Sequence, residues 1–394
     1  MTRTDTNTAE RQQDRSYARQ SVDCEGNCPR SGDRSYARHV LLAGDFAAMD
    51  SPGGGEIQMG AMVRTLPSVG VQARLWRPWE DRLDSATGSG GRCVDCLHLL
   101  GSLPQHVPVV EAARRRGTPV VLSTIAWFDP ANCLREPRSW SWRAAAGARF
   151  MARSACPWLP SWRRRLYRSV DLLLPNSNAE AEQLVRYFRV PRQQIHVVPN
   201  GADERFATAD PEPFARLAGA QGFVLCAGRI EPRKNQLGLI RAMRGTRVPV
   251  VILGDTVPGH EAYMHACRRA ADGNVRFVPR IDHDDPLLGS AYAACGCLVL
   301  PGWFETPGLA ALEAGMSGTP LVLPHGGCAR EYFGPHAAYV KPGDLRGIRR
   351  AVVDAMARGR SASLAELVRT SFTWKTAAEV TRVAYERVVR GTRP

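Results

Sequence analysis

Short runs of apolar residues recur along this chain, separated by segments in which apolar residues follow a helical period. Several runs are apolar at every position, which is typical of parallel strands covered on both faces. In the first half of the chain these runs occupy residues 39–46, 94–100, 119–125, 170–176 and 195–200. After residue 202 the alternation restarts with FVLCAG, VPVVILG, VRFVP, GCLVLPG and TPLVLP. The pattern predicts an α/β protein with two doubly wound, Rossmann-like domains facing across a cleft.

The same pattern divides the chain. Residues 1–37 are polar and are predicted to be a disordered tail. Residues 38–202 are expected to form the first Rossmann-like domain, and residues 203–375 the second. A last helical pattern, at about 376–391, is expected to pack back on the first domain.

Composition narrows the possible partners. The net charge is +14, but only three of the 52 basic residues are lysines, and no nucleic-acid-binding motif accompanies the arginines. We therefore expect no nucleic-acid partner. The polar N-terminus lacks the apolar core of a signal peptide, and no run reaches the roughly 18 apolar residues of a spanning helix. Most of the eleven cysteines lie in apolar runs. These features favour a cytoplasmic protein with reduced thiols.

A basic loop follows the first strand pattern of the second domain. In AGRIEPRKNQ, Arg229, Arg233 and Lys234 cluster between that strand and a helix. Cations beside the free N–H groups of a helix start suit a phosphate. The segment lacks the P-loop pattern GxxxxGK[ST], so it is not an NTPase loop. Taken alone, the segment is better explained as a solvated basic loop.

Two glutamates, Glu305 and Glu313, stand eight positions apart in FETPGLAALEAGM. A helix starting near Pro307 would separate their backbones by about 12 Å, from a rise of about 1.5 Å per residue. Paired glycosidase carboxylates work at about 5–9.5 Å. The spacing therefore favours two contacts along one elongated ligand over a facing acid and nucleophile.

The order of GRIEPRKNQ, then FETPGLAALEAGMSGTPLVLP, then HGGCAREYFGPHAAYVKPGD resembles the donor-binding half of glycosyltransferase family 4. The resemblance covers residues from about 170 to 390 and is looser in the first half. It implies the GT-B fold and a retaining hexosyltransferase that needs no metal or other cofactor. Such an enzyme moves a sugar from a UDP-, GDP- or dTDP-linked donor to a hydroxyl acceptor, which can be a glycan, a lipid-linked glycan or a small molecule.

The resemblance also implies roles for single residues. Arg229 and Lys234 would hold the donor diphosphate. Glu305, the candidate catalytic residue, would contact the transferred sugar, and Glu313 the ribose. Gly308 and Leu309, at the helix start, would offer backbone N–H groups to the phosphates. Arg280 would border the base.

The acceptor side is less clear. Gly54 and Gly55, in PGGGE, would belong to a glycine loop close to the donor phosphates, or to a plain strand-to-helix turn. Many relatives carry a histidine after the strand at 119–125, where this chain reads STIAWFD. His98 is expected to pack beside the sheet. The possible substitutes for the missing histidine are Ser123, Thr124 and Asp129.

Two short motifs resemble metal-binding or redox motifs of other proteins. The DHD at 282–284 resembles the DxD metal motif of another glycosyltransferase fold, but Asp285 followed by Pro286 predicts a helix cap. Cys93 and Cys96 have the CxxC spacing of redox or zinc sites. No second pair accompanies them, and Cys96 lies in an apolar run, so an inert role is favoured. We predict no metal site.

Residues 135–168 contain nine arginines, four tryptophans and a single acid, Glu136. This composition fits a peripheral element at a membrane interface. A helix that packs on the acceptor domain with an arginine-rich outer face is slightly favoured over that interpretation.

Two other functions fit the same resemblance: a nucleotide-sugar epimerase of this fold and a non-catalytic nucleotide-sugar-binding protein. A non-catalytic binder is expected to have lost part of the phosphate site or one glutamate. The basic residues of the phosphate site and both glutamates are present in this sequence.

Overall fold

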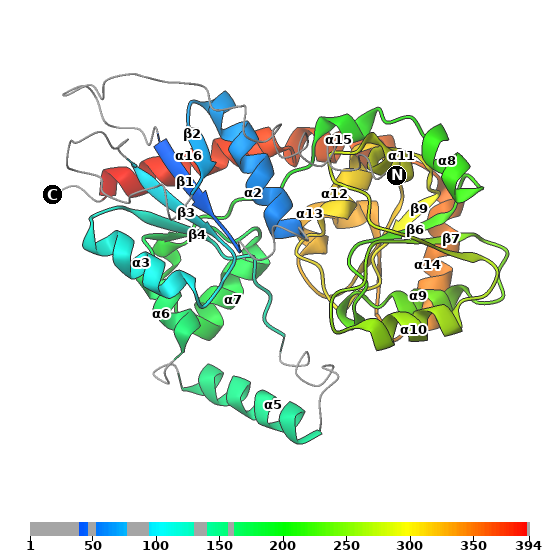
Figure 1. Ribbon diagram of the computed structural model, residues 1–394, viewed down its shortest axis with the longest axis horizontal. Helices are drawn as coiled ribbons and strands as arrows, with labels where there is room; N and C mark the ends of the chain where they lie inside the picture. The colour runs from blue at the N-terminus through cyan, green and yellow to red at the C-terminus, as the bar shows by residue number, and fades with distance from the viewer. Residues whose placement is uncertain (1–38, 46–52, 77–93, 130–139, 157–160, 392–394) are drawn as a thin grey trace, which may run out of the picture. The chain divides into compact units, whose positions relative to one another are not determined.

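The computed structural model describes residues 39–45, 53–76, 94–129, 140–156 and 161–391, which form two parallel sheets (Figure 1). The first sheet has the order β2-β1-β3-β4-β5. Its strands are β1 (His39–Ala43), β2 (Gln72–Leu75), β3 (Cys96–Leu100), β4 (Val120–Ser123) and β5 (Leu172–Leu173). The chain order reverses between β1 and β3, and ligands of such sheets bind beyond the carboxyl ends of strands at the reversal.

The second sheet has the order β11-β10-β9-β6-β7-β8. Its strands are β6 (Val224–Ala227), β7 (Val250–Leu253), β8 (Val275–Val278), β9 (Cys297–Val299), β10 (Leu321–Pro324) and β11 (Ala337–Val340). This is the dinucleotide-binding order, and the reversal lies between β6 and β9. The predicted α/β class with two doubly wound sheets is confirmed.

Helices cover both faces of each sheet. Those of the first half are α2 (Gly54–Thr65), α3 (His106–Arg115), α6 (Trp162–Ser169) and α7 (Asn178–Phe188), whereas α5 (Trp140–Ala155) lies away from the sheet (Figure 1). The second half contains α8 (Glu212–Ala218), α9 (Gln236–Met243), α10 (Glu261–Ala270), α11 (Pro286–Ala294), α12 (Leu309–Met316), α13 (Ala329–Phe333), α14 (Leu345–Arg358), α15 (Ala362–Ser371) and α16 (Trp374–Gly391).

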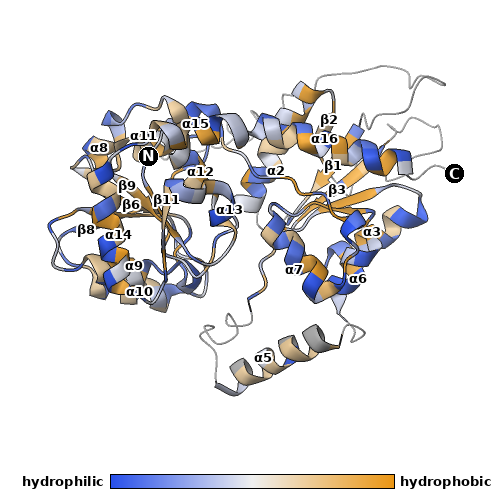
Figure 2. Ribbon diagram, turned by 180° about the vertical axis from the view of Figure 1, so that it is seen from behind, coloured by the Kyte–Doolittle hydropathy of each residue, from blue (hydrophilic) through white to orange (hydrophobic). Residues whose placement is uncertain are grey.

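The central strands consist largely of apolar residues, drawn in orange in Figure 2, because both faces of each sheet are covered. In β6, Val224 and Cys226 pack on one side of the sheet. Leu225 and Ala227 pack on the other. Successive strand side chains point to opposite faces, so a sheet between two helical layers must be apolar throughout. Full burial of each large aliphatic side chain contributes about 1.5–3 kcal/mol.

Three strand predictions need correction. Residues 195–200 contribute only an isolated bridge between Ile195 and Leu173. The strands β2 and β11 were not expected from the pattern. Both lie at a sheet edge, where partial exposure removes the continuous apolar run that marks a central strand.

The last helix, α16, crosses back to the first sheet and packs on α2, as Figure 1 shows in red and blue. Its buried residues Trp374, Ala378 and Tyr385 join the core on one face of that sheet. Where the chain passes into the second half, Ala202 bridges to Thr373, and its N–H donates to Phe372 at 2.8 Å.

The packing at this crossing generates a stability prediction. A Cβ atom on Gly201 would lie 2.3 Å from the backbone of Thr373 and Trp374. Gly201→Ala should therefore destabilise the fold by about 1–3 kcal/mol, the usual cost of overpacking. Gly343→Ala is the control, because nothing lies within 4 Å of the added carbon. Thermal unfolding should give a lower Tm for Gly201→Ala alone, and equal Tm values for both variants would contradict the packing.

Candidate active site

The basic loop lies at the strand reversal of the second sheet. It leaves β6 at Ala227 and contains a short 3-10 turn, Pro232–Lys234, before α9 begins. The Lys234 Nζ donates to Glu305 Oε1 at 2.6 Å. The Arg229 side chain is 52% exposed, so its guanidinium can reach a ligand. The structure therefore brings together Lys234 and Glu305, which are 71 residues apart in the chain.

Glu305 lies beyond β9, at the other strand that borders the reversal. Its side chain is buried apart from a 5% exposed fraction, and its backbone forms a bridge with Gly327. A Cβ on Gly327 would lie 2.1 Å from the Glu305 carbonyl oxygen, so only glycine permits this approach. Gly308, with φ of +88°, precedes the first residue of α12. The helix thus starts at Leu309, two residues later than predicted, with Glu305 close to its N-terminus.

Glu313 is held from two sides inside the second domain. The Tyr292 hydroxyl donates to Oε2 at 2.7 Å, and His283 Nε2 lies 2.9 Å from Oε1. An Arg205 N–H donates to His283 Nδ1 at 3.1 Å. A guanidinium only donates, so Nδ1 accepts and Nε2 carries the proton that bonds Glu313. Burial, with a smaller contribution from the charge on Glu313, raises the pKa of Tyr292 well above its usual value of 10.

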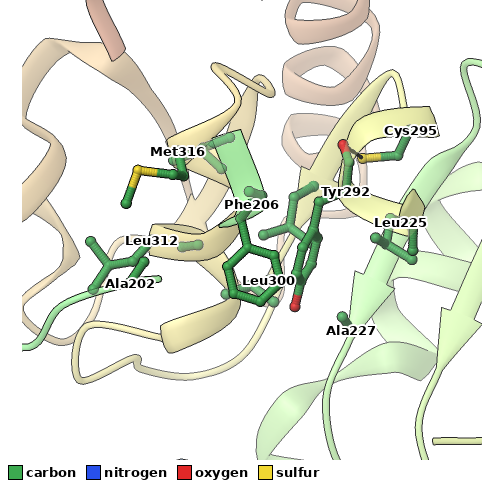
Figure 3. Packing of buried hydrophobic residues seen from close by; sticks show 14 of the residues in the cluster. Ala202, Phe206, Leu225, Ala227, Tyr292, Cys295, Leu300, Leu312 and Met316 are labelled. Carbon is green, nitrogen blue, oxygen red and sulfur yellow. Dashed lines mark hydrogen bonds between the residues drawn. The ribbon is translucent and has the colours of Figure 1, made fainter. Parts of the chain in front are cut away.

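The apolar residues around this network fix its geometry. Figure 3 shows the rings of Phe206 and Tyr292 side by side, with Leu300 and Leu312 nearby. The two ring centroids lie 5.6 Å apart in an edge-on arrangement. The packed rings leave the Tyr292 hydroxyl little freedom to leave Glu313.

Arg280 lies in the loop after β8. Its backbone N–H donates to Asp255 at 3.1 Å, and its guanidinium lies 3.5 Å from Asp282. Three residues further on, His283 contacts Glu313. The loop thus reaches Glu313 through His283, which the sequence interpretation considered only as part of a metal-like motif.

The predicted helix cap is confirmed. Asp285 Oδ1 accepts from the Leu287 N–H at 2.8 Å, and Pro286 is the first residue of α11. Asp284 lies 3.6 Å from Arg205. Within the described ranges, no three His, Cys, Asp or Glu side chains are arranged to hold a metal ion.

The glycine-rich segment meets the donor loop. Gly54 and Gly55 are the first two residues of α2, and Gly53 caps it. A Cβ on Gly53 would lie 3.5 Å from an Arg229 nitrogen, and one on Gly54 would lie 3.6 Å from Leu309. Gly53 and Gly54 thus stand against two predicted donor residues.

A cavity of about 480 Å³ opens beside this contact. It lies at the strand reversal of the first sheet, where β1 and β3 end. Acidic, basic and aromatic groups share its walls, which are formed by Gly44, Asp45, Gly53, Gly54, Gly55, Glu56, Met59, Leu100, Gly101, Ser102, Leu103, Ile125, Ala126, Trp127, Phe128, Arg163 and Arg229.

The proposed substitutes for an acceptor-side histidine do not line this cavity. His98 is buried in β3, as predicted, and its ring nitrogens bond Tyr385 at 2.6 Å and Ser123 at 2.9 Å. Burial lowers the pKa of His98 to about 3. Ser123 is thereby occupied, and Thr124 is fully buried. Ser123 and Thr124 are structural residues, and Asp129 lies beyond the cavity wall.

A buried acid organises the loop after β4, and the sequence interpretation missed it. Glu180 Oε1 accepts from the Thr124 hydroxyl at 2.5 Å and the Ala126 N–H at 2.7 Å, and Oε2 accepts from the Asn176 N–H at 2.9 Å. Burial raises the pKa of Glu180 to about 7, while these hydrogen bonds favour the ionised form. The signal was present as Ser177-x-x-Glu180, a helix-capping pattern that predicts only local contacts.

The CxxC pair and the arginine-rich segment lie only partly within the residues that the structure describes. Cys96 is buried in β3, and burial raises the pKa of its thiol far above the usual value, so it is unreactive. Cys93 lies outside the described residues. In the arginine-rich segment, Trp140 is 72% and Met151 61% exposed on α5, whereas Trp162 is partly buried. None of the described helices is both long and apolar enough to cross a membrane.

Two family profiles match the chain in succession. The first, described as "Glycosyl transferase 4-like domain", matches residues 33–201. The second, "Glycosyl transferases group 1", matches residues 212–363. The chain is 30% identical over 250 residues to a D-inositol 3-phosphate glycosyltransferase of Streptomyces bingchenggensis, covering 57% of this chain and 54% of that protein. It is 31% identical over 253 residues to a glycogen synthase of Mycobacterium tuberculosis, covering 59% and 57%. The chain therefore spans about half the length of the curated relatives it matches.

Solved structures with the same fold cover almost the whole chain. Sucrose-phosphate synthase from Thermosynechococcus elongatus superposes with a TM-score of 0.69 at 18% identity, over 90% of this chain and all of that one. Anabaena HepE in complex with UDP and glucose gives 0.64 at 15%, over 89% and 99%. These likenesses establish the fold. Both halves of the chain thus match glycosyltransferase profiles, and the chain shares the two-sheet GT-B fold of the solved enzymes.

Proposed function

We propose that this protein transfers a sugar from a nucleotide-sugar donor to a hydroxyl acceptor, with retention of configuration and without a metal ion. The contact between Lys234 and Glu305, at the N-terminus of α12 and at the strand reversal of the second sheet, carries the proposal. A leaving nucleotide diphosphate gains negative charge, which preorganised cations and N–H groups stabilise.

The diphosphate would lie between the basic loop and the start of α12. Lys234 has three donor positions, so it can keep Glu305 and still bind a phosphate oxygen. Arg229 would approach from the same loop. The N–H groups of Gly308 and Leu309 would complete the site, because the first N–H groups of a helix lack partners within it. In this arrangement protein groups supply the positive charge that a metal ion supplies elsewhere.

Glu305 and Glu313 would contact different parts of the donor. Glu305, before the helix start, would meet the transferred sugar. Glu313 accepts one bond on each oxygen from the protein, and each oxygen has a second lone pair for a ribose hydroxyl. Arg280 would border the base.

The acceptor would enter the cavity beside Gly54 and Gly55, with its hydroxyl directed toward the donor. HepE binds UDP, which makes UDP-sugars the first donors to test. A thermal-shift screen of UDP-, GDP- and dTDP-sugars tests the proposal, since a ligand that binds only the folded protein raises its apparent stability. Binding followed by transfer, with the anomeric configuration read by proton NMR, would establish the reaction.

We further propose that α5 contacts an anionic membrane surface. Trp140 and Met151 are exposed on it, and residues 135–168 carry nine arginines against one acid. Exposed aromatic and apolar groups among arginines suit the interface of anionic lipids.

The two glutamates should have different kinetic signatures. Glu313→Gln should raise the donor KM about 10- to 100-fold, from the 1.5–3 kcal/mol of a hydrogen bond to a charged group, with kcat nearly unchanged. Glu305→Gln should lower kcat by about 10²–10³, because charge develops at the sugar in the transition state. Steady-state kinetics with the donor found in the screen measure both. Equal losses of kcat with donor KM unchanged would restore a paired catalytic role.

Donor binding should survive chelation. The stabilisation that a UDP-sugar gives in the thermal-shift assay should be the same in excess EDTA and in added Mn²⁺, because Arg229, Lys234 and the start of α12 supply the positive charge. Lys234→Met should abolish the shift in either condition. A shift that disappears with EDTA and returns with Mn²⁺ would overturn metal independence.

The membrane contact should depend on the exposed residues of α5. The protein should co-sediment with vesicles of phosphatidylglycerol and phosphatidylcholine, less strongly as salt rises. The double variant Trp140→Ser, Met151→Ser should lose this binding. Leu217→Ser with Val353→Ser, which removes two exposed apolar side chains of the second domain, should retain it. Unchanged binding of the α5 variant would refute the proposal.

A further inference from the structure

The loop after β4 contains a strained residue. Ile125 has a φ of +43°, a region that a β-branched side chain rarely adopts. Such conformations cost about 1–3 kcal/mol and persist only where surrounding contacts enforce them. The contacts of the residues on either side of Ile125 should therefore show what maintains its strained conformation.

Side chains of α7 hold the loop on both sides of Ile125. Glu180 Oε1 accepts from the Thr124 hydroxyl and from the Ala126 N–H. Further along, Gln183 accepts from the Phe128 N–H at 2.7 Å. With Thr124 and Ala126 both bonded to one carboxylate oxygen, the residue between them cannot relax to an extended conformation without breaking a buried hydrogen bond.

The strained loop forms one wall of the cavity, from Ile125 to Phe128. The Ile125 Cδ1 would lie 3.6 Å from a Cβ on Gly55. The Trp127 ring stacks on Phe304, with centroids 6.3 Å apart and an angle of 26° between the planes. Phe304 immediately precedes Glu305, so the loop contacts both the start of α2 and the donor segment.

The start of α7 is tied to the donor half as well. Glu331 of α13 accepts from the Asn178 N–H at 2.7 Å and the Ala179 N–H at 3.1 Å. The Asn176 side chain donates to the Thr306 carbonyl at 3.4 Å. The same Asn176 donates its backbone N–H to Glu180. Glu180 thus bonds the cavity wall through one oxygen and a residue anchored to the donor segment through the other.

We propose that Glu180 is a positioning residue that holds residues 124–128 in their strained conformation and so places the acceptor-side wall of the cavity against Phe304 and Glu305. Glu180 is fully buried and is not itself one of the residues that line the cavity. We expect its effect on the acceptor side, because Glu180 makes no direct contact with the predicted donor residues Arg229 and Lys234. The assignment of this wall to the acceptor rests on the proposed function, whereas the hold on the loop does not.

Amide hydrogen exchange of the full chain tests the hold without any substrate. Glu180→Ala should speed exchange of the Ala126 and Asn176 amides at least tenfold, because both lose their acceptor. Glu182→Ala is the matched control, since that glutamate lies on the same helix but is 67% exposed. If Glu180→Ala fails to fold, Glu180→Gln keeps the size and has one acceptor oxygen, which can face either amide. Unchanged protection in both Glu180 variants would overturn the proposal.

A second set of variants tests whether Glu180 maintains the strained conformation of Ile125 or only accepts hydrogen bonds from its neighbours. In Glu180→Gln, the Phe128 amide, which bonds Gln183, should also exchange faster because the loop relaxes around residue 125. Adding Ile125→Gly should restore its protection, since glycine adopts positive φ at little cost. Adding Ile125→Ala, which shortens the side chain but keeps the strain, should not restore it. If neither or both restore protection, Glu180 does not act through the strained conformation.

Ligand measurements place the effect on one side of the site. The thermal shift produced by UDP should be the same in Glu180→Gln as in the unmodified protein. With the donor found in the screen and a hydroxyl acceptor that supports transfer, the acceptor KM should rise at least tenfold and the donor KM should stay within twofold. A lost UDP response in the variant alone would overturn the acceptor-side assignment. Absence of binding to UDP, GDP and dTDP alike in the unmodified protein would instead count against the proposed function and leave the exchange test decisive for Glu180.

Discussion

The short hydrogen bond between Lys234 and Glu305 links the two strands at which the second sheet reverses its order. Glu305 is almost fully buried, and a buried carboxylate is stable only with a charged or hydrogen-bonding partner. Removing one member of such a pair commonly costs 3–5 kcal/mol. The close approach of Gly327 to the Glu305 backbone and the positive φ of Gly308 both serve to place this carboxylate beside the start of α12.

The other conspicuous buried acids are held differently. Glu313 bonds Tyr292 and His283, and His283 is in turn oriented by Arg205. Glu180 accepts three hydrogen bonds from neutral groups, and burial raises its pKa to about 7. Each arrangement satisfies a carboxylate with donors that also fix a neighbouring loop or ring. Polar groups away from the ligand thereby determine the shape of the site.

The two halves of the site differ in how directly their residue types indicate chemistry. On the donor side, charged residues stand at the carboxyl ends of strands, where parallel sheets bind ligands. On the proposed acceptor side, the cavity wall combines glycines with aliphatic and aromatic side chains and a few charged groups, Arg163 and Arg229 among them. The loop from Ile125 to Phe128 in this wall is held by α7 side chains behind it.

The sequence by itself determined the central strands, because a strand buried on both faces must be apolar throughout. It also indicated that Arg229, Lys234 and Glu305 lie in loops after strands, and such loops meet at one edge of a parallel sheet. Only the tertiary structure decided that Glu180 bonds Thr124, 56 residues away, and that His283 bonds Glu313, 30 residues away. Periodicity reports that a side chain is buried but not which distant group it meets. That choice depends on how the helices and loops pack, so the residues that shape the site from behind became visible only in the folded chain.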